Sequence, residues 1–288
     1  MQTVMIDGIE TRYEVLGSGP ALLMYAPGGF DATIEKWSGL GIYEKVKPLA
    51  HLSRHYRCVV FDRRECGQSG GRVERITWDH YVIQGIGLLD HLGIHKAHVM
   101  GGCMGCCPAI AMTVTHPDRV LSSVFFWPVG GPHYRLNGHR RFNEHVVFAA
   151  AQGLHEVIKV AREGKSFGAD PRGGPWASVI RRDPVFAARF AEQDLNSYLL
   201  IAGLTGRTLI DRDTSPGAEP EDMMRIKTPA LIIPGSDASH ATSAARYIQE
   251  SISGAEYWDV PVSQQTEADT MKTMLEFLDR AEGRRLGA

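Results

Sequence analysis

The sequence predicts an α/β fold with a mostly parallel sheet, an antiparallel N-terminal hairpin and an inserted helical cap. Three observations predict it. Short apolar runs alternate with stretches of helical spacing along most of the 288 residues. A tight turn at Asp7-Gly8 joins two strand-like segments at the beginning. Between about residues 130 and 228 the alternation lapses and the readable periodicity is helical.

Local patterns define the elements in order. The hairpin comprises 2–6 and 9–16, and the apolar run 21–26 is a buried strand that ends abruptly at Pro27. Further buried strands are predicted at 58–62, 97–101, 120–127, 229–235 and 256–260. Helices are predicted between or after them, at 43–56, 77–94, 105–117, 242–252 and 268–282. Helical stretches also occur at 142–163 and 184–204.

These elements predict two parts of the chain. Residues 1–129 and 228–288 form an α/β core, because strands and helices alternate in both segments. Residues 130–227 form a helical cap, or lid, inserted between two strands of the same sheet.

Composition limits the partners of the protein. The net charge is −2, and no block of Lys or Arg predicts binding to nucleic acid or to an anionic membrane. No apolar run approaches the roughly 20 residues that span a bilayer, and the N-terminal segment lacks the pattern of a secretory signal. We therefore expect a cytoplasmic protein that acts on a small molecule; a homodimer stays open.

Three of the five cysteines lie in the stretch HVMGGCMGCCPA, residues 98–109. Cys103-x-x-Cys106 has the spacing of half a zinc site, but no second pair of ligands follows. A dithiol redox motif leaves the preceding glycines unexplained. In a small-x-nucleophile-x-small turn, Gly101 and Gly105 flank a sharp bend that presents Cys103 between a strand and a helix. An inert buried thiol in a glycine-rich turn is the remaining alternative.

With this turn the sequence resembles the α/β-hydrolase superfamily, with Cys103 in the position of the usual serine, as in dienelactone hydrolases. The resemblance covers nearly the whole chain and implies the α/β-hydrolase fold. It also implies an oxyanion hole built from the N–H of Gly29 or Phe30 and the N–H of Met104, directly after the nucleophile. The stretch CVVFDRRECGQSGG is similar to a family turn, D-x-R-G-x-G-x-S, although Glu65 replaces a glycine; we expect it to be structural.

The resemblance places the catalytic acid at Asp237, in PALIIPGSDASHA. The family's histidine normally follows the last strand, but PVSQQTEADTMKTMLEFL contains none, and Gln264 and Gln265 occupy that place. His240 is the candidate base because the acid loop and the histidine loop are neighbours in this fold. Its alternative role is to cap the helix predicted from residue 242.

These features predict a cofactor-independent, metal-free hydrolase whose Cys103 thiol attacks a reactive ester, lactone or thioester carbonyl. A thiol needs less activation than a serine hydroxyl, because it is partly ionised at neutral pH and the start of a helix lowers its pKa. The sequence contains neither a G-x-G-x-x-G motif after a strand nor a P-loop, so it predicts no nucleotide cofactor. Phe30, Trp127 and Phe142 are candidates for the pocket wall. Two other functions stay open: a small-molecule binding or sensing protein with a degenerate triad, and an acyltransferase or carbon–carbon bond hydrolase.

Overall fold

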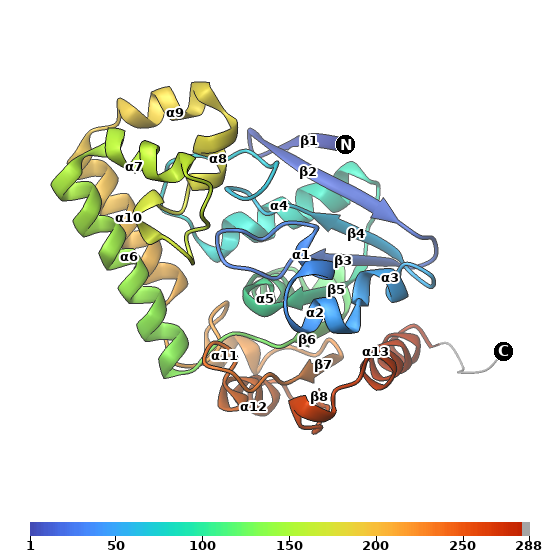
Figure 1. Ribbon diagram of the computed structural model, residues 1–288. Coiled ribbons are helices and arrows are strands. Elements are labelled where there is room, and N and C mark those ends of the chain that lie inside the picture. Colours follow the sequence, from blue (N-terminus) through green and yellow to red (C-terminus); the bar gives the residue numbers. More distant parts are fainter. Residues whose placement is uncertain (284–288) are drawn as a thin grey trace.

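The computed structural model describes residues 1–283, which contain a single eight-stranded sheet of order β1-β2-β4-β3-β5-β6-β7-β8 (Figure 1). The first two strands form an antiparallel hairpin, β2 is antiparallel to β4, and every other neighbouring pair is parallel. The predicted sheet is therefore confirmed. The strands are β1 Gln2–Ile6, β2 Ile9–Leu16, β3 Ala21–Tyr25, β4 Arg57–Phe61, β5 Ala97–Gly102, β6 Val120–Phe126, β7 Ala230–Ile233 and β8 Glu256–Tyr257.

Helices cover both faces of the sheet. They are α1 Lys36–Gly39, α2 Ile42–Val46, α3 Pro48–Leu52, α4 Trp78–His91, α5 Cys106–Thr115, α12 Thr242–Ser251 and α13 Glu267–Ala281. Successive strand residues alternate between two hydrophobic clusters: Leu23 and Tyr25 pack with α4, α5 and α12, whereas Leu22 and Met24 pack with α2, α3 and α13. The sheet is thus buried on both sides, as its apolar strands predict.

The segment between β6 and β7 contains α6 Pro132–Gln152, α7 Leu154–Arg162, α8 Ala177–Arg182, α9 Pro184–Ala191, α10 Leu195–Leu209 and α11 Pro220–Met223. Figure 1 shows α6 to α10 gathered at one side of the sheet. Residues 284–288, the end of the predicted second core segment, lie outside the described residues. From residue 1 to residue 283, no helix combines the length and the apolar character that crossing a membrane requires.

Several predicted elements are divided or shortened. The helix predicted at 43–56 breaks at Lys47, which has a left-handed φ of +51° and precedes Pro48, a position where helical backbone is disfavoured. The stretch 142–163 breaks at Gly153, with φ +81°. The stretch 184–204 restarts at Asp194, whose carboxylate caps α10 by accepting the Ser197 N–H at 2.8 Å. At the sheet edge, β8 has two residues instead of five, and these pair with Leu231 and Ile232 of β7.

Candidate active site

Cys103 lies at the bend between β5 and α5, in a left-handed conformation with φ +52° that is uncommon for any residue but glycine. Close packing of backbone on backbone creates the bend. A Cβ atom on Gly101 would lie 2.4 Å from the Gly105 carbonyl oxygen, and one on Gly105 would lie 2.2 Å from the Tyr25 carbonyl oxygen in β3. Both glycines are therefore required by close approach, and the strained backbone holds Cys103 at the carboxyl edge of the sheet.

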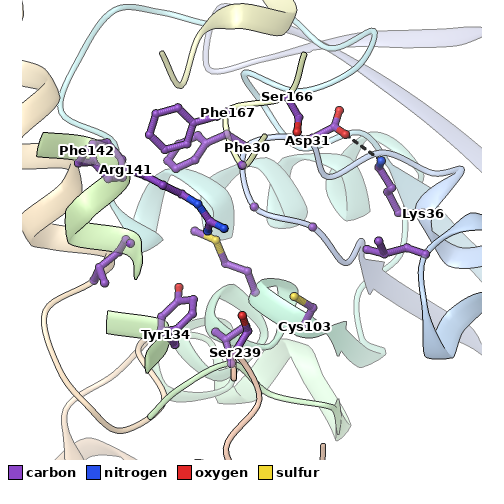
Figure 2. A pocket seen from close by; sticks show the side chains of 18 residues that line it. Phe30, Asp31, Lys36, Cys103, Tyr134, Arg141, Phe142, Ser166, Phe167 and Ser239 are labelled. Carbon is purple, nitrogen blue, oxygen red and sulfur yellow. Dashed lines mark ion pairs between the residues drawn. The ribbon is translucent and has the colours of Figure 1, made fainter. Parts of the chain in front are cut away.

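The Cys103 side chain lines a cavity of about 270 Å³ at this edge of the sheet (Figure 2). Phe30 and Phe142 form part of its apolar wall, as predicted, together with Met104, Val129, Phe167 and Ile210. Trp127 lies outside this lining: its ring is 5.5 Å from the His240 ring, and its indole N–H donates to Gln265 at 2.8 Å. The thiol thus faces a mainly apolar pocket of the size of a small ligand.

Asp237 and His240 lie together in the loop between β7 and α12. The Asp237 carboxylate accepts the backbone N–H groups of Ser239 at 2.8 Å and His240 at 3.0 Å, which closes a local turn. The same carboxylate is 2.8 Å from Nδ1 of the His240 ring, so Nδ1 is the donor and Nε2 is left free. Gly235 leaves room for the ring, because a Cβ there would lie 2.6 Å from the His240 Cβ.

His240 and Cys103 form a coupled pair. Nε2 of His240 is buried and has no hydrogen-bonding nitrogen or oxygen partner among residues 1–283, and the ring interacts electrostatically with the thiol. Burial alone would raise the pKa of Cys103, but the charge of His240 and the N–H groups of Gly28 and Met104 lower it below its ordinary value. Burial opposes the imidazolium, yet the Cys103 thiolate and Asp237 raise the pKa of His240. The hydrogen bond from His240 lowers the pKa of Asp237 to about 2.

Two backbone amides interact with the Cys103 sulfur. One is Met104, the predicted donor directly after Cys103, and the other is Gly28. The predicted alternatives, Gly29 and Phe30, line the same cavity next to Gly28, and their role as oxyanion donors stays a prediction. The Arg63 guanidinium binds the Gly28 carbonyl at 2.6 Å and also the Gly29 carbonyl, which fixes the orientation of this turn.

The loop in which the family usually has its histidine is structural in this chain. Gln265 is buried; its side-chain oxygen accepts the Trp127 indole N–H, and its nitrogen donates to the carbonyls of Pro234 at 2.8 Å and Val260 at 3.1 Å. His240 does not cap the next helix, because the N-cap of α12 is Ala241 and no side chain caps it. The only polar partner of the His240 ring with ordinary hydrogen-bond geometry within residues 1–283 is Asp237.

The other cysteines are free and buried. Cys106 donates its S–H to the Gly101 carbonyl at 3.1 Å, and burial raises its pKa well above the ordinary value, as burial also does for Cys107. Neither thiol is therefore a nucleophile in this state. No group of three or more His, Cys, Asp or Glu side chains in the described part of the chain could hold a metal ion. Glu65, at φ +68°, is buried and paired with Arg64 at 3.0 Å, a structural role.

Sequence reasoning missed the polar residues of the cavity, and two of them, Tyr134 and Arg141, lie on α6. With Gly138 and Phe142 they follow the spacing i, i+4, i+7 and i+8, which places all four on one face of the helix. That spacing was readable in the sequence, but it does not show which face of a cap helix turns toward the core.

Comparison with known proteins agrees with this geometry. Residues 22–143 match the family model for the α/β hydrolase fold. The enol-lactonase of Burkholderia xenovorans LB400 superposes with a TM-score of 0.62 and 22% identity, over 96% of this chain and 99% of that chain. The strand order, the sharp turn after β5 and these matches define the class: the chain has the α/β-hydrolase fold.

Two curated relatives match over part of their length. The dihydrolipoyllysine-residue acetyltransferase component of the acetoin cleaving system of Cupriavidus necator is 32% identical over 125 residues, 43% of this chain and 31% of that protein. The 2-hydroxy-6-oxononadienedioate/2-hydroxy-6-oxononatrienedioate hydrolase of Paraburkholderia phymatum is 30% identical over 135 residues, 45% of this chain and 44% of that protein. This chain spans less than half the length of each.

Proposed function

We propose that this protein is a cofactor-independent hydrolase that uses Cys103 as its nucleophile, His240 as its base and Asp237 to orient that base. One observation carries the proposal: a single turn holds Asp237 against Nδ1 of His240, while the free Nε2 belongs to the ring that is coupled to the Cys103 thiol. This arrangement of a thiol, an imidazole and a carboxylate supports the proposal, because covalent catalysis uses a nucleophile, a base and a group that orients the base.

The first half of the reaction forms an acyl-enzyme. The Cys103 thiolate attacks the carbonyl carbon of the substrate, and the N–H groups of Gly28 and Met104 donate to the oxygen as it becomes negative. When the intermediate collapses, the bond to the leaving group breaks and the leaving group takes a proton from Nε2 of His240. A thioester to Cys103 remains.

The second half releases the acid. Nε2 of His240, now neutral, removes a proton from water, and the hydroxide attacks the thioester carbonyl. The Cys103 thiolate leaves as the carbon–sulfur bond breaks. The proton taken from water stays on Nε2 of His240, so the thiolate and the imidazolium are restored. A good leaving group favours the first half, so activated esters, enol lactones and thioesters suit this site better than amides. Two of the similar proteins, the enol-lactonase of Burkholderia xenovorans and the 2-hydroxy-6-oxononadienedioate/2-hydroxy-6-oxononatrienedioate hydrolase of Paraburkholderia phymatum, support a carbonyl substrate.

The test combines turnover with labelling of the thiol. We expect the protein to hydrolyse isopropenyl acetate or p-nitrophenyl acetate, Cys103→Ala to abolish this activity, and His240→Ala to reduce kcat/KM by about 10² to 10⁴, the usual contribution of a general base. Iodoacetamide should modify Cys103 at a pH below that needed for an ordinary thiol, because the pKa of Cys103 is lowered. His240→Ala should shift this labelling profile to higher pH.

Two variants serve as matched controls. Cys58→Ala removes a buried thiol of β4, and His55→Ala removes an exposed imidazole, so both should retain full activity. Turnover of these esters that is equal in Cys103→Ala and the unaltered protein would refute the proposal. A Cys103 that labels like a free thiol and a protein without turnover would instead favour the small-molecule binding function.

A further inference from the structure

Arg141 stands out among the residues that line the cavity. It lies on α6, is partly buried, and its guanidinium makes no hydrogen bond or ion pair with any residue from 1 to 283. Figure 2 shows the side chain extending into the cavity, on the side opposite Cys103. Five N–H donors without a partner beside an apolar wall make a site that is incomplete without an anion.

Tyr134 gives a second, independent observation. Its hydroxyl is buried, has no hydrogen-bond partner in the described chain, and points into the same cavity (Figure 2). Tyr134 lies about two turns of α6 before Arg141, on the same face of the helix. A buried hydroxyl without a partner costs free energy that a bound ligand would recover. The two unpartnered groups therefore face one ligand-sized space.

The acidic groups near the cavity are already paired. Asp31 binds Lys36 at 2.8 Å, Asp211 binds Arg212, and Asp237 binds the His240 ring at 2.8 Å. Lys36 is the other cation of the lining, and its charge is neutralised by Asp31. Arg141 thus carries the unbalanced positive charge of the pocket wall within residues 1–283.

We propose that Arg141 and Tyr134 form a subsite for a carboxylate group of the substrate, so that the substrate of Cys103 is a small carbonyl compound that also carries a carboxylate. This inference rests on the proposed function for the identity of the reacting group. A planar guanidinium binds a carboxylate through two parallel hydrogen bonds, and the Tyr134 hydroxyl can donate a third. The cavity of about 270 Å³ limits the substrate to a small molecule.

The first experiment needs no turnover. Iodoacetate and iodoacetamide differ only in carrying a carboxylate or an amide, and both alkylate a thiolate: the sulfur–carbon bond forms and iodide leaves. We expect the ratio of iodoacetate to iodoacetamide rates at Cys103, measured by mass spectrometry of the labelled peptide, to fall about tenfold in Arg141→Met. Tyr134→Phe should lower the ratio a few-fold, and Arg141→Lys should restore part of it.

Arg140→Met is the matched control. Arg140 is the preceding residue of α6, is exposed and lines a different groove, so its substitution makes the same change in net charge. We expect it to leave both labelling rates unchanged. A second experiment compares p-nitrophenyl hemiglutarate with p-nitrophenyl valerate: the unaltered protein should prefer the anionic ester in kcat/KM, and Arg141→Met should reduce that preference about tenfold.

The outcomes separate the subsite from the hydrolase. A labelling ratio that is equal in Arg141→Met, Arg140→Met and the unaltered protein would overturn the subsite, even if all three hydrolyse esters. A labelling ratio that depends on Arg141 in a protein that hydrolyses neither ester would support the subsite and contradict the hydrolase. Thermal unfolding of each variant establishes that the folded protein is compared.

Discussion

The turn that presents Cys103 depends on the close approach of backbone at Gly101 and Gly105, and Gly105→Ala tests this dependence. In the structure, an added Cβ at Gly105 would lie 2.2 Å from the Tyr25 carbonyl oxygen and 2.8 Å from that of Ala26. Both atoms belong to the backbone at the end of β3, in the middle of the sheet, so no side-chain rotation relieves the overlap. The start of α5 must move away from β3 by about 1 Å before the contact becomes ordinary.

This movement has an effect on stability and an effect on chemistry. Overpacking by one methyl group lowers the free energy of unfolding by about 1–3 kcal/mol in a core that can adjust. At Gly105 the added group meets backbone atoms, which adjust less than side chains, so we expect a loss at the upper end of this range. For a chain of 288 residues that corresponds to a decrease in Tm of about 5 °C. A displacement of about 1 Å also moves the Cys103 sulfur relative to His240 and the Gly28 amide, which can cost about a hundredfold in rate.

The assay measures Tm by calorimetry and the iodoacetamide rate of Cys103 at neutral pH, for Gly105→Ala and for Gly203→Ala. Gly203 lies inside α10 with no atom within 4 Å of an added Cβ. Alanine there should raise Tm slightly, since it replaces glycine in a helix interior at a gain of about 0.5–1 kcal/mol. If Gly105→Ala keeps its Tm within 2 °C and its labelling rate within about twofold, the close approach of α5 and β3 does not position the thiol.

Two further predictions concern buried polar groups. Gln265→Met should destabilise the protein by about 2–3 kcal/mol in urea unfolding, because it leaves the Trp127 indole and two backbone carbonyls unpaired; an unchanged urea midpoint would contradict this. Burial lowers the pKa of His145 from 6.5 to about 4. The contribution of His145 to stability should therefore be constant above pH 6.5 and decrease by up to about 3 kcal/mol as the pH falls toward 4. His145→Gln, which cannot titrate, should flatten that decrease.

The fold was predictable because its signals are local and repeated. Each central strand is a short apolar run, and the two hydrophobic clusters use alternate residues of these runs. The cap was less predictable. Its helices begin and end at single residues, such as the left-handed Gly153 and the cap residue Asp194, within continuous amphipathic patterns. Position within such a pattern does not indicate where a helix stops.

The residues of the site differ in the same way. Cys103 and its glycines share one contiguous motif, and Asp237 and His240 follow one strand, so sequence spacing was sufficient to nominate them. The sequence could not decide between the Gly29 and Phe30 amides as oxyanion donor, because that choice depends on the path of the backbone after Pro27. Arg141 required knowledge of which side of α6 faces the cavity.

The position of His240 explains why the usual histidine loop could become structural. In this chain the acid and the proposed base occupy one four-residue turn, in which the Asp237 carboxylate binds two backbone N–H groups and the imidazole at once. The orientation of the ring is therefore set by local geometry and does not depend on the loop after β8. That loop retains the Gln265 side chain, which joins Trp127 to two backbone carbonyls behind the His240 ring. A thiol suits such a site, because an ion pair with His240 favours attack even where the base is carried by a short turn.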